Sequence, residues 1–154
     1  FSLGLLVLLG FLFAGRRAMP YSRKNVLFTP AEQRFLATLD ACCPSSMRVF
    51  GKVRIADVLA VTATRKKTFW HYFKQISSKH LDYVIVDRAS NRILCAIELD
   101  DSSHNQAHRT KRDEFVDAAC EAAGLPLIRM PVRRSYDRNA LARELHASIS
   151  SNNT

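Results

Sequence analysis

The sequence contains few cysteines, and their spacing excludes the common zinc-binding patterns. Four cysteines occur in 154 residues, at Cys42, Cys43, Cys95 and Cys120. None of them forms a C-x-x-C pair, and no cysteine–histidine spacing matches a zinc site. Cys95 and Cys120 are expected to be small buried apolar residues, and the adjacent Cys42 and Cys43 to be free thiols. This usage is typical of a reducing compartment.

Acidic residues are also scarce relative to basic ones. The chain has 14 Asp and Glu against 23 Lys and Arg, which leaves a net charge of +9 and a pI near 9.8. A basic excess of this size suggests a polyanionic partner, either nucleic acid or an anionic lipid surface, and does not choose between them. The length allows one domain with a hydrophobic core.

No apolar run reaches the usual membrane-spanning length. Residues 1–15 are uncharged, but a spanning helix needs about 20 residues. Because the chain begins with Phe1, we expect further residues upstream. The basic residues that follow indicate a cytoplasmic C-terminal side, by the positive-inside rule; they are Arg16, Arg17, Arg23 and Lys24.

These features predict a single-pass protein of the inner (cytoplasmic) membrane. Residues 1–15 would form a transmembrane anchor, residues 16–28 a basic linker, and residues 29–150 a cytoplasmic domain. A cleaved signal peptide is a weaker alternative, because no clear small-x-small cleavage site precedes the basic residues.

The rest of the chain alternates between helix and strand patterns. Thr29 as N-cap, Pro30 at the first helical position and Glu32 as the capping-box acid predict a helix to about Cys42. Glu32 could also reach an acidic site. The later patterns predict strands at about 48–55, 81–87, 93–100 and 125–130, and helices around 69–76, 102–123 and 136–149. We therefore expect an α/β fold, with one mixed sheet and helices on both of its faces.

The stretch Phe69-Trp70-His71-Tyr72-Phe73-Lys74 is dense in aromatic residues beside basic ones. The favoured interpretation is a helix that packs Phe69, Phe73 and Ile76 into the core. The alternative is contact with a nucleic-acid backbone or its bases.

Residues 81–104 contain the main candidate site. Two apolar, β-branched runs flank residues 88–92, a pattern typical of a β-hairpin with a five-residue loop. Symmetric closure pairs Asp87 with Ile93 and Val86 with Leu94. It also pairs Val84 with Ala96 and Asp82 with Glu98. Asp100 shares the face of Glu98, since it lies two residues further along the strand.

This register predicts three carboxylates at one end of an otherwise apolar sheet. Unpaired carboxylates would repel one another, and a divalent cation removes that penalty. Carboxylates together with a backbone carbonyl are the oxygen ligands that Mg²⁺ or Mn²⁺ prefers. The alternative is that the acids cap strand ends and face water. His104, His108 and Arg112 follow on one helix face, where an arginine could contact a phosphate or hold a carboxylate.

Several segments resemble the domain of unknown function DUF2726 and, more widely, the PD-(D/E)XK nuclease superfamily. The resemblance covers about residues 29–131. The sequence of this region is also similar to restriction-like and very-short-patch-repair endonucleases. Its most specific part is Glu98-Leu99-Asp100-Asp101-Ser102-Ser103-His104. The other matching segments are 29–35, 76–83 and Arg112-Asp113 through Pro126.

The resemblance implies a restriction-endonuclease-like fold and a set of site residues. Asp82 and Glu98 would be metal ligands, with the Leu99 carbonyl as a third. Glu32 matches a helix glutamate that sometimes assists, and His104 would orient or deprotonate water. Asp100, the remaining member of the predicted catalytic set, stands where the superfamily has its signature lysine.

The implied function is a divalent-metal-dependent nuclease-like activity on DNA, with Mg²⁺ or Mn²⁺ and no small-molecule cofactor. Arg112, Arg109 and Lys79 would contact the nucleic acid. Because Asp100 replaces the lysine, a catalytically inactive nucleic-acid- or protein-binding module of the same fold is the alternative. A third hypothesis is a membrane-surface protein whose basic linker contacts anionic lipid.

Overall fold

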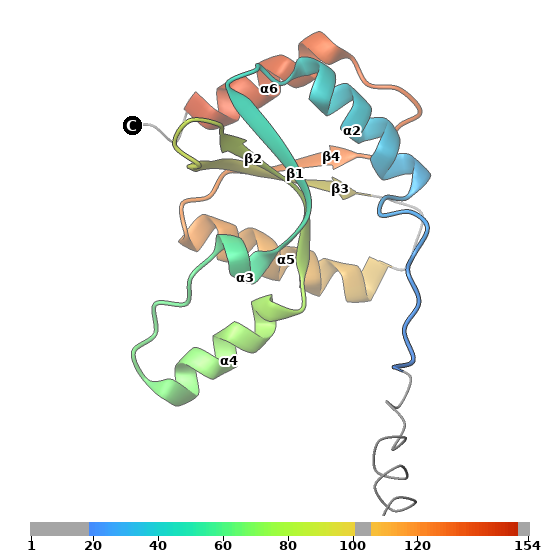
Figure 1. Ribbon diagram of the computed structural model, residues 1–154. Helices are drawn as coiled ribbons and strands as arrows, with labels where there is room; N and C mark the ends of the chain where they lie inside the picture. The colour runs from blue at the N-terminus through green and yellow to red at the C-terminus, as the bar shows by residue number, and fades with distance from the viewer. Residues whose placement is uncertain (1–18, 101–105, 151–154) are drawn as a thin grey trace, which may run out of the picture.

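A four-stranded mixed sheet forms the centre of the molecule (Figure 1). The computed structural model describes residues 19–100 and 106–150, and within 106–112 it describes the backbone alone. The strands are β1 (Met47–Arg54), β2 (His80–Asp87), β3 (Ile93–Asp100) and β4 (Leu127–Pro131), in that spatial order. β2 pairs antiparallel with both β1 and β3, whereas β4 runs parallel to β3. The predicted α/β class with a mixed sheet is confirmed.

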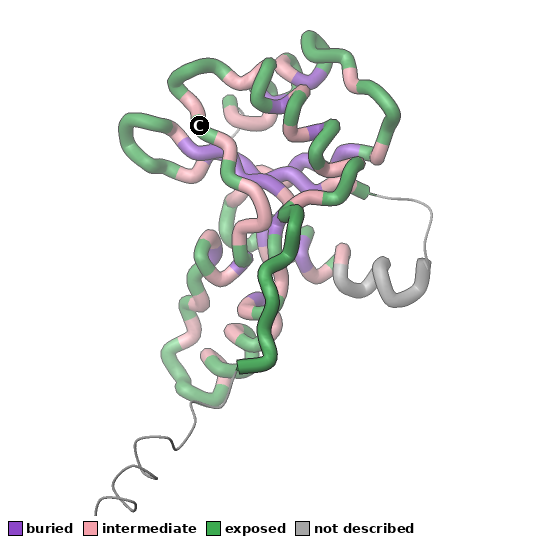
Figure 2. The backbone as a smooth tube through the Cα atoms, turned by 45° about the vertical axis from the view of Figure 1, so that its right-hand side comes forward, coloured by how far each residue is buried: buried purple, intermediate pink, exposed green. Residues whose placement is uncertain are grey.

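Helices cover both faces of this sheet. On one face lie α2 (Pro30–Cys42) and α6 (Arg138–Ser150), which pack on each other and on the strands through Phe35, Leu39, Leu141 and Leu145. On the other face lie α3 (Ile55–Val58), α4 (Lys66–Ser77) and α5 (Gln106–Ala122), which contribute Ile55, Ile76, Val116 and Cys120. The most deeply buried chain runs through the central strands (Figure 2).

The first turn of α2 forms as its sequence predicts. The Thr29 hydroxyl accepts a hydrogen bond from the Glu32 amide at 3.3 Å, and the Glu32 carboxylate accepts one from the Thr29 amide at 2.8 Å. This reciprocal pair satisfies two amides that a helix N-terminus otherwise leaves without partners. The phenol of Tyr83 donates to the Glu32 carbonyl at 2.7 Å, so the start of α2 is also tied to β2.

The hairpin between β2 and β3 forms with one irregularity. Val84 pairs with Ala96, as predicted, but Val86 pairs with Ile93. The predicted Val86–Leu94 and Asp87–Ile93 pairs are therefore wrong. The register shifts between Ile85 and Val86, where a bulge adds one residue to β3. As a result, Leu94 and its neighbour Cys95 are both buried in the core next to α2 and α6.

The other predicted elements lie within a few residues of their expected bounds. α5 ends before Gly124, whose φ of +64° is the left-handed conformation that terminates many helices. Ala123, which directly follows the last residue of α5, is exposed. Of the residues predicted to pack α4 inward, only Ile76 is fully buried. Cys95 and Cys120 are buried, and all four cysteines are free thiols.

The predicted membrane anchor, residues 1–15, lies outside the described residues. Among the helices that the structure describes, none is long and apolar enough to cross a membrane. The start of the helix predicted from Ser102 or Ser103 lies outside the described residues as well.

Candidate functional site

Asp82 and Glu98 lie opposite each other at one end of the sheet, which we call the carboxylate end. Tyr83 pairs with Ile97, so the antiparallel register sets the preceding residue of β2 against the following residue of β3. Directly opposed residues of such a pair share a face, with Cβ atoms about 4.5–5.5 Å apart. The Asp82 carboxylate also accepts a hydrogen bond from the Leu99 amide at 2.9 Å. The side chain is thereby held against β3.

Lys52 of β1 brings a positive charge to this end. It lies between Gly51, which pairs with Tyr83, and Val53, which pairs with Leu81, so it stands opposite Asp82. Its ammonium nitrogen is 2.5 Å from a Glu32 carboxylate oxygen and 3.6 Å from an Asp82 carboxylate oxygen. A row of three alternating charges therefore joins α2, β1 and β2.

The backbone at Lys52 is unusual. Its φ of +57° lies in the left-handed region, which side chains with a Cβ rarely adopt. Such a conformation costs about 1–3 kcal/mol and persists where the surroundings stabilise it. The ammonium of this residue is held by two carboxylates, those of Glu32 and Asp82. The neighbouring Gly51 lies under the ring of Phe28, and a Cβ at position 51 would collide with that ring.

The electrostatics keep both members of the Lys52–Glu32 pair charged. Burial by itself raises the pKa of Glu32, but the hydrogen bonds from Lys52 and Thr29 outweigh it and lower the pKa below 4.5. Burial likewise opposes the charge on Lys52, and the interactions with Glu32 and Asp82 outweigh it and raise the pKa of that ammonium above 10.5. Lys52 is thus a fixed cation near neutral pH and does not serve as a base.

Glu98 is the one charged side chain that is buried within residues 19–100 and 113–150, at 8% exposure. Its side chain lies on the α5 side of the sheet, because it shares a face of β3 with Ala96, which packs in one cluster with Cys120. Burial raises the pKa of the Cys120 thiol to about 11, and the nearby charges of Asp117 and Glu98 add to that rise. A buried carboxylate is costly unless hydrogen bonds or cations compensate it. Burial of the Glu98 carboxylate therefore requires partners that compensate its charge.

Asp100 is held on the β4 side of the carboxylate end. Its carboxylate accepts a hydrogen bond from the Arg129 guanidinium at 2.9 Å, and Asp117 accepts another from the same group at 2.8 Å. Burial opposes the charge on Arg129, but the two carboxylates outweigh it and raise its pKa further. Across the described parts of the chain, no three His, Cys, Asp or Glu side chains gather as a metal site would require.

The remaining predicted residues are placed only in part. His104 lies outside the described residues, as do the side chains of Arg109 and Arg112. Lys79 is described: its ammonium donates to the Gln75 carbonyl and lies 4.9 Å from the centre of the Phe115 ring. The proposed roles of these residues in binding or chemistry stay predictions.

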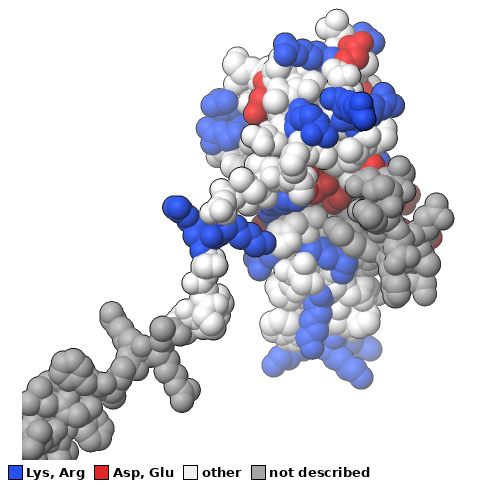
Figure 3. All heavy atoms as spheres, turned by 90° about the vertical axis from the view of Figure 1, so that its right-hand side faces the viewer, with Lys and Arg blue, Asp and Glu red and all other residues white. Residues whose placement is uncertain are grey.

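Sequence reasoning missed Lys52 and Arg129. Both stand on strands remote from the hairpin, and each reaches its carboxylate only through the sheet order. The alternation of β1 gave no signal for Lys52, because this lysine shares the more exposed face of the strand with Arg48 and Arg54. Figure 3 shows acidic side chains in the middle of the face beside this end, with basic side chains above and below them.

Comparison with known proteins gives one match. A family model described as a protein of unknown function, DUF2726, matches residues 24–149. Searches of the curated proteins and of the solved structures found no significant match.

Proposed function

Because the chain belongs to the DUF2726 family, whose function is unknown, we propose its activity from the carboxylate end: a divalent-metal-dependent nuclease-like activity on DNA. One observation carries the proposal. Asp82 and Glu98 oppose each other on adjacent strands, and a charged lysine lies 3.6 Å from Asp82. Two acids and one cation at this spacing suit a phosphodiester and its counterion.

The donor chemistry fits a hard cation. Asp82, Glu98 and the Leu99 carbonyl would hold Mg²⁺ or Mn²⁺, since these ions prefer oxygen ligands. When bound, such an ion supplies a Lewis acid for the phosphate and acidifies a water.

Lys52 supplies the second positive charge. The resemblance to PD-(D/E)XK nucleases leads one to expect a lysine at position 100, and Lys52 reaches the neighbouring acid from β1 instead. Its raised pKa keeps it protonated, so its role is to stabilise the negative charge of a phosphate oxygen. Glu32 holds the ammonium in place through their 2.5 Å contact. Removal of a proton from water is assigned to His104, which stays a prediction.

The alternative is a binding module of the same fold that does not cleave. It is favoured by the pairing of Asp100 with Arg129, because Asp100 is thereby occupied by an internal partner. Such a module would bind nucleic acid or protein in a salt-sensitive way without needing a metal.

The test uses the full chain with single-stranded, duplex and branched DNA and with RNA, in Mg²⁺ or Mn²⁺ and in EDTA. Asp82→Asn and Lys52→Met should abolish cleavage, and Asp82→Asn should also weaken Mn²⁺ binding measured by calorimetry. Asp57→Asn is the matched control, because Asp57 of α3 is an exposed acid that pairs with Arg54 at the end of β1. Cleavage that survives Asp82→Asn would refute the assignment. Binding without cleavage in any metal would establish the alternative.

A further inference from the structure

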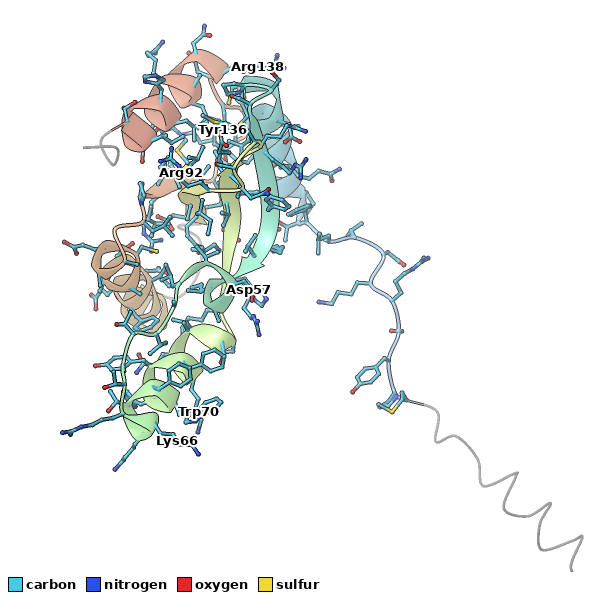
Figure 4. All side chains as sticks on the ribbon, turned by 60° about the vertical axis from the view of Figure 1, so that its left-hand side comes forward. Asp57, Lys66, Trp70, Arg92, Tyr136 and Arg138 are labelled. Carbon is cyan, nitrogen blue, oxygen red and sulfur yellow. The ribbon has the colours of Figure 1, made fainter. Side chains whose placement is uncertain are left out.

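Helix α4 differs in charge from the rest of the chain. Residues 58–81 contain no Asp or Glu and include Arg65, Lys66, Lys67, Lys74 and Lys79. Within α4, which the structure describes in full, Ile76 is the one buried side chain. Figure 1 shows the helix extending away from the sheet, and Figure 4 shows Lys66 and Trp70 on its outer part.

Phe69, Trp70 and Phe73 form an aromatic cluster on α4. Phe69 and Phe73 stack with centroids 5.7 Å apart, and Trp70 meets each of them edge to face, at 5.4 and 5.6 Å. These contacts restrict the indole. Trp70 nevertheless remains 47% exposed, so part of its surface is accessible to a planar partner.

A shallow, open groove of about 650 Å³ lies beside this indole and is called here the α4 groove. It is lined by Lys67, Trp70, His71, Lys74, Gln75 and Lys79. None of these six described residues is acidic, and three are lysines. His71 Nε2 lies 2.9 Å from the Gln75 side-chain nitrogen, which adds polar groups between the lysines. Figure 3 shows the basic side chains gathered at this end of the molecule.

We propose that the α4 groove binds single-stranded nucleic acid, with a base stacked on Trp70 and phosphates held by Lys67 and Lys74. Both interactions are typical of single-strand binding, in which aromatic side chains stack on unpaired bases and a basic groove follows the backbone. Charge complementarity supports a polyanion, since the lining carries positive charge alone. A membrane surface fits less well, because Phe69 and Phe73 stack on each other and α4 exposes no broad apolar face.

The proposal deepens the proposed function, and rests on it only for the link between binding and cleavage. Lys79 at the end of the groove precedes Asp82 by three residues, and β2 begins between them. Three residues of strand span about 10 Å. A strand bound in the α4 groove would therefore lead toward the carboxylate end.

Trp70 is the single tryptophan of the chain, so the tryptophan fluorescence of the protein reports on the α4 groove. The full chain is titrated with a short oligothymidine, and we expect quenching of the Trp70 fluorescence. The matching duplex should quench less, because its bases are already stacked. Lys67→Ala with Lys74→Ala should reduce the slope of log affinity against log salt by about 1.4, because each neutralised phosphate contributes about 0.7. Arg138→Ala with Arg143→Ala removes equal charge from exposed positions of α6 and is the control.

Trp70→Ala should weaken binding of a labelled oligothymidine, measured by anisotropy, by about tenfold, and Trp70→Phe by less. Circular dichroism checks that each variant is folded. Unchanged affinity in folded Trp70→Ala and in the double lysine variant would overturn the proposal. So would weaker binding to phosphatidylglycerol vesicles in these variants while oligothymidine binding is unaffected. Asp82→Asn should leave the quenching intact, which separates a failure of this proposal from a failure of the proposed nuclease.

Discussion

At the carboxylate end, Lys52 lies between Glu32 and Asp82, whereas the lysines of α4 lie beside aromatic rings in a segment with no acid. The first cation is held by internal partners at defined distances. The second group faces water over most of its surface. Charges of the first kind are oriented before a substrate arrives, as chemistry on a phosphate requires. Charges of the second kind can exchange counterions for a mobile polyanion.

The two regions also differ in how they are packed. The hairpin that carries Asp82 and Glu98 contains several fully buried residues, including Tyr83, Ile85 and Ile97. α4 contributes only Ile76 to the core and otherwise makes contacts at its surface. We therefore expect the carboxylate end to share the global stability of the domain, and α4 to tolerate change. Four measurements test this difference between the two regions.

The largest effect is expected for Ile97→Ala in β3. Ile97 is fully buried and neighbours Glu98. The reduced burial and the cavity should lower the free energy of unfolding by about 2–5 kcal/mol. Urea denaturation followed by circular dichroism measures this. A decrease below about 1 kcal/mol would mean that the hairpin is less tightly packed than its burial indicates.

Lys52→Met should have a smaller effect, of about 1–2 kcal/mol. It leaves Glu32 and Asp82 without the cation between them, and these side chains are 14% and 19% exposed. Arg54→Met is the matched control, because its partner Asp57 is 53% exposed, and exposed ion pairs contribute little to stability. Equal decreases in the free energy of unfolding of the two variants would show that the pairing at Lys52 stabilises the protein no more than an exposed ion pair does.

The difference in stability between wild type and Lys52→Met should depend on pH. The pKa of Glu32 is lowered on folding, so its pairing stabilises the protein above pH 4.5 and is lost as the pH falls through the lower folded value. The pKa of Lys52 is raised, so its contribution is present below pH 10.5 and is lost as the pH rises through the higher folded value. Denaturation at about pH 7 and about pH 3 should show a smaller difference at the lower pH.

The smallest effect is expected for Trp70→Ala. About half of this side chain is already exposed, and its contacts are with neighbouring rings of the same helix. We expect a change within about 1 kcal/mol in the free energy of unfolding. Thermal unfolding measures it, with Tyr72→Ala as the control, since Tyr72 is 50% exposed on the same helix. A much larger decrease would make the aromatic cluster part of the core.

Local patterns predicted the elements well. The capping box at Thr29 and Glu32 and the alternation of the hairpin depend on neighbours within a few residues, and both formed. The bulge at Ile85 and Val86 was not predicted, because the symmetric closure of the loop assumed that every residue of β2 pairs with one residue of β3. α4 was expected to pack its phenylalanines inward, but its periodicity could not reveal that the helix extends away from the sheet.

Which acids face each other follows from the sequence alone, because Asp82 and Glu98 belong to one hairpin, and beyond the bulge its strands keep the register that their apolar pattern predicts. Which cations accompany these acids follows from the tertiary structure. Lys52 and Arg129 lie far from these acids along the chain, and they meet them because β1 pairs with β2 and β4 pairs with β3. The pairing of β4 with β3 and the packing of the helices depend on burial of apolar surface by distant residues. The local periodicity of a segment does not indicate which distant residues will pack against it.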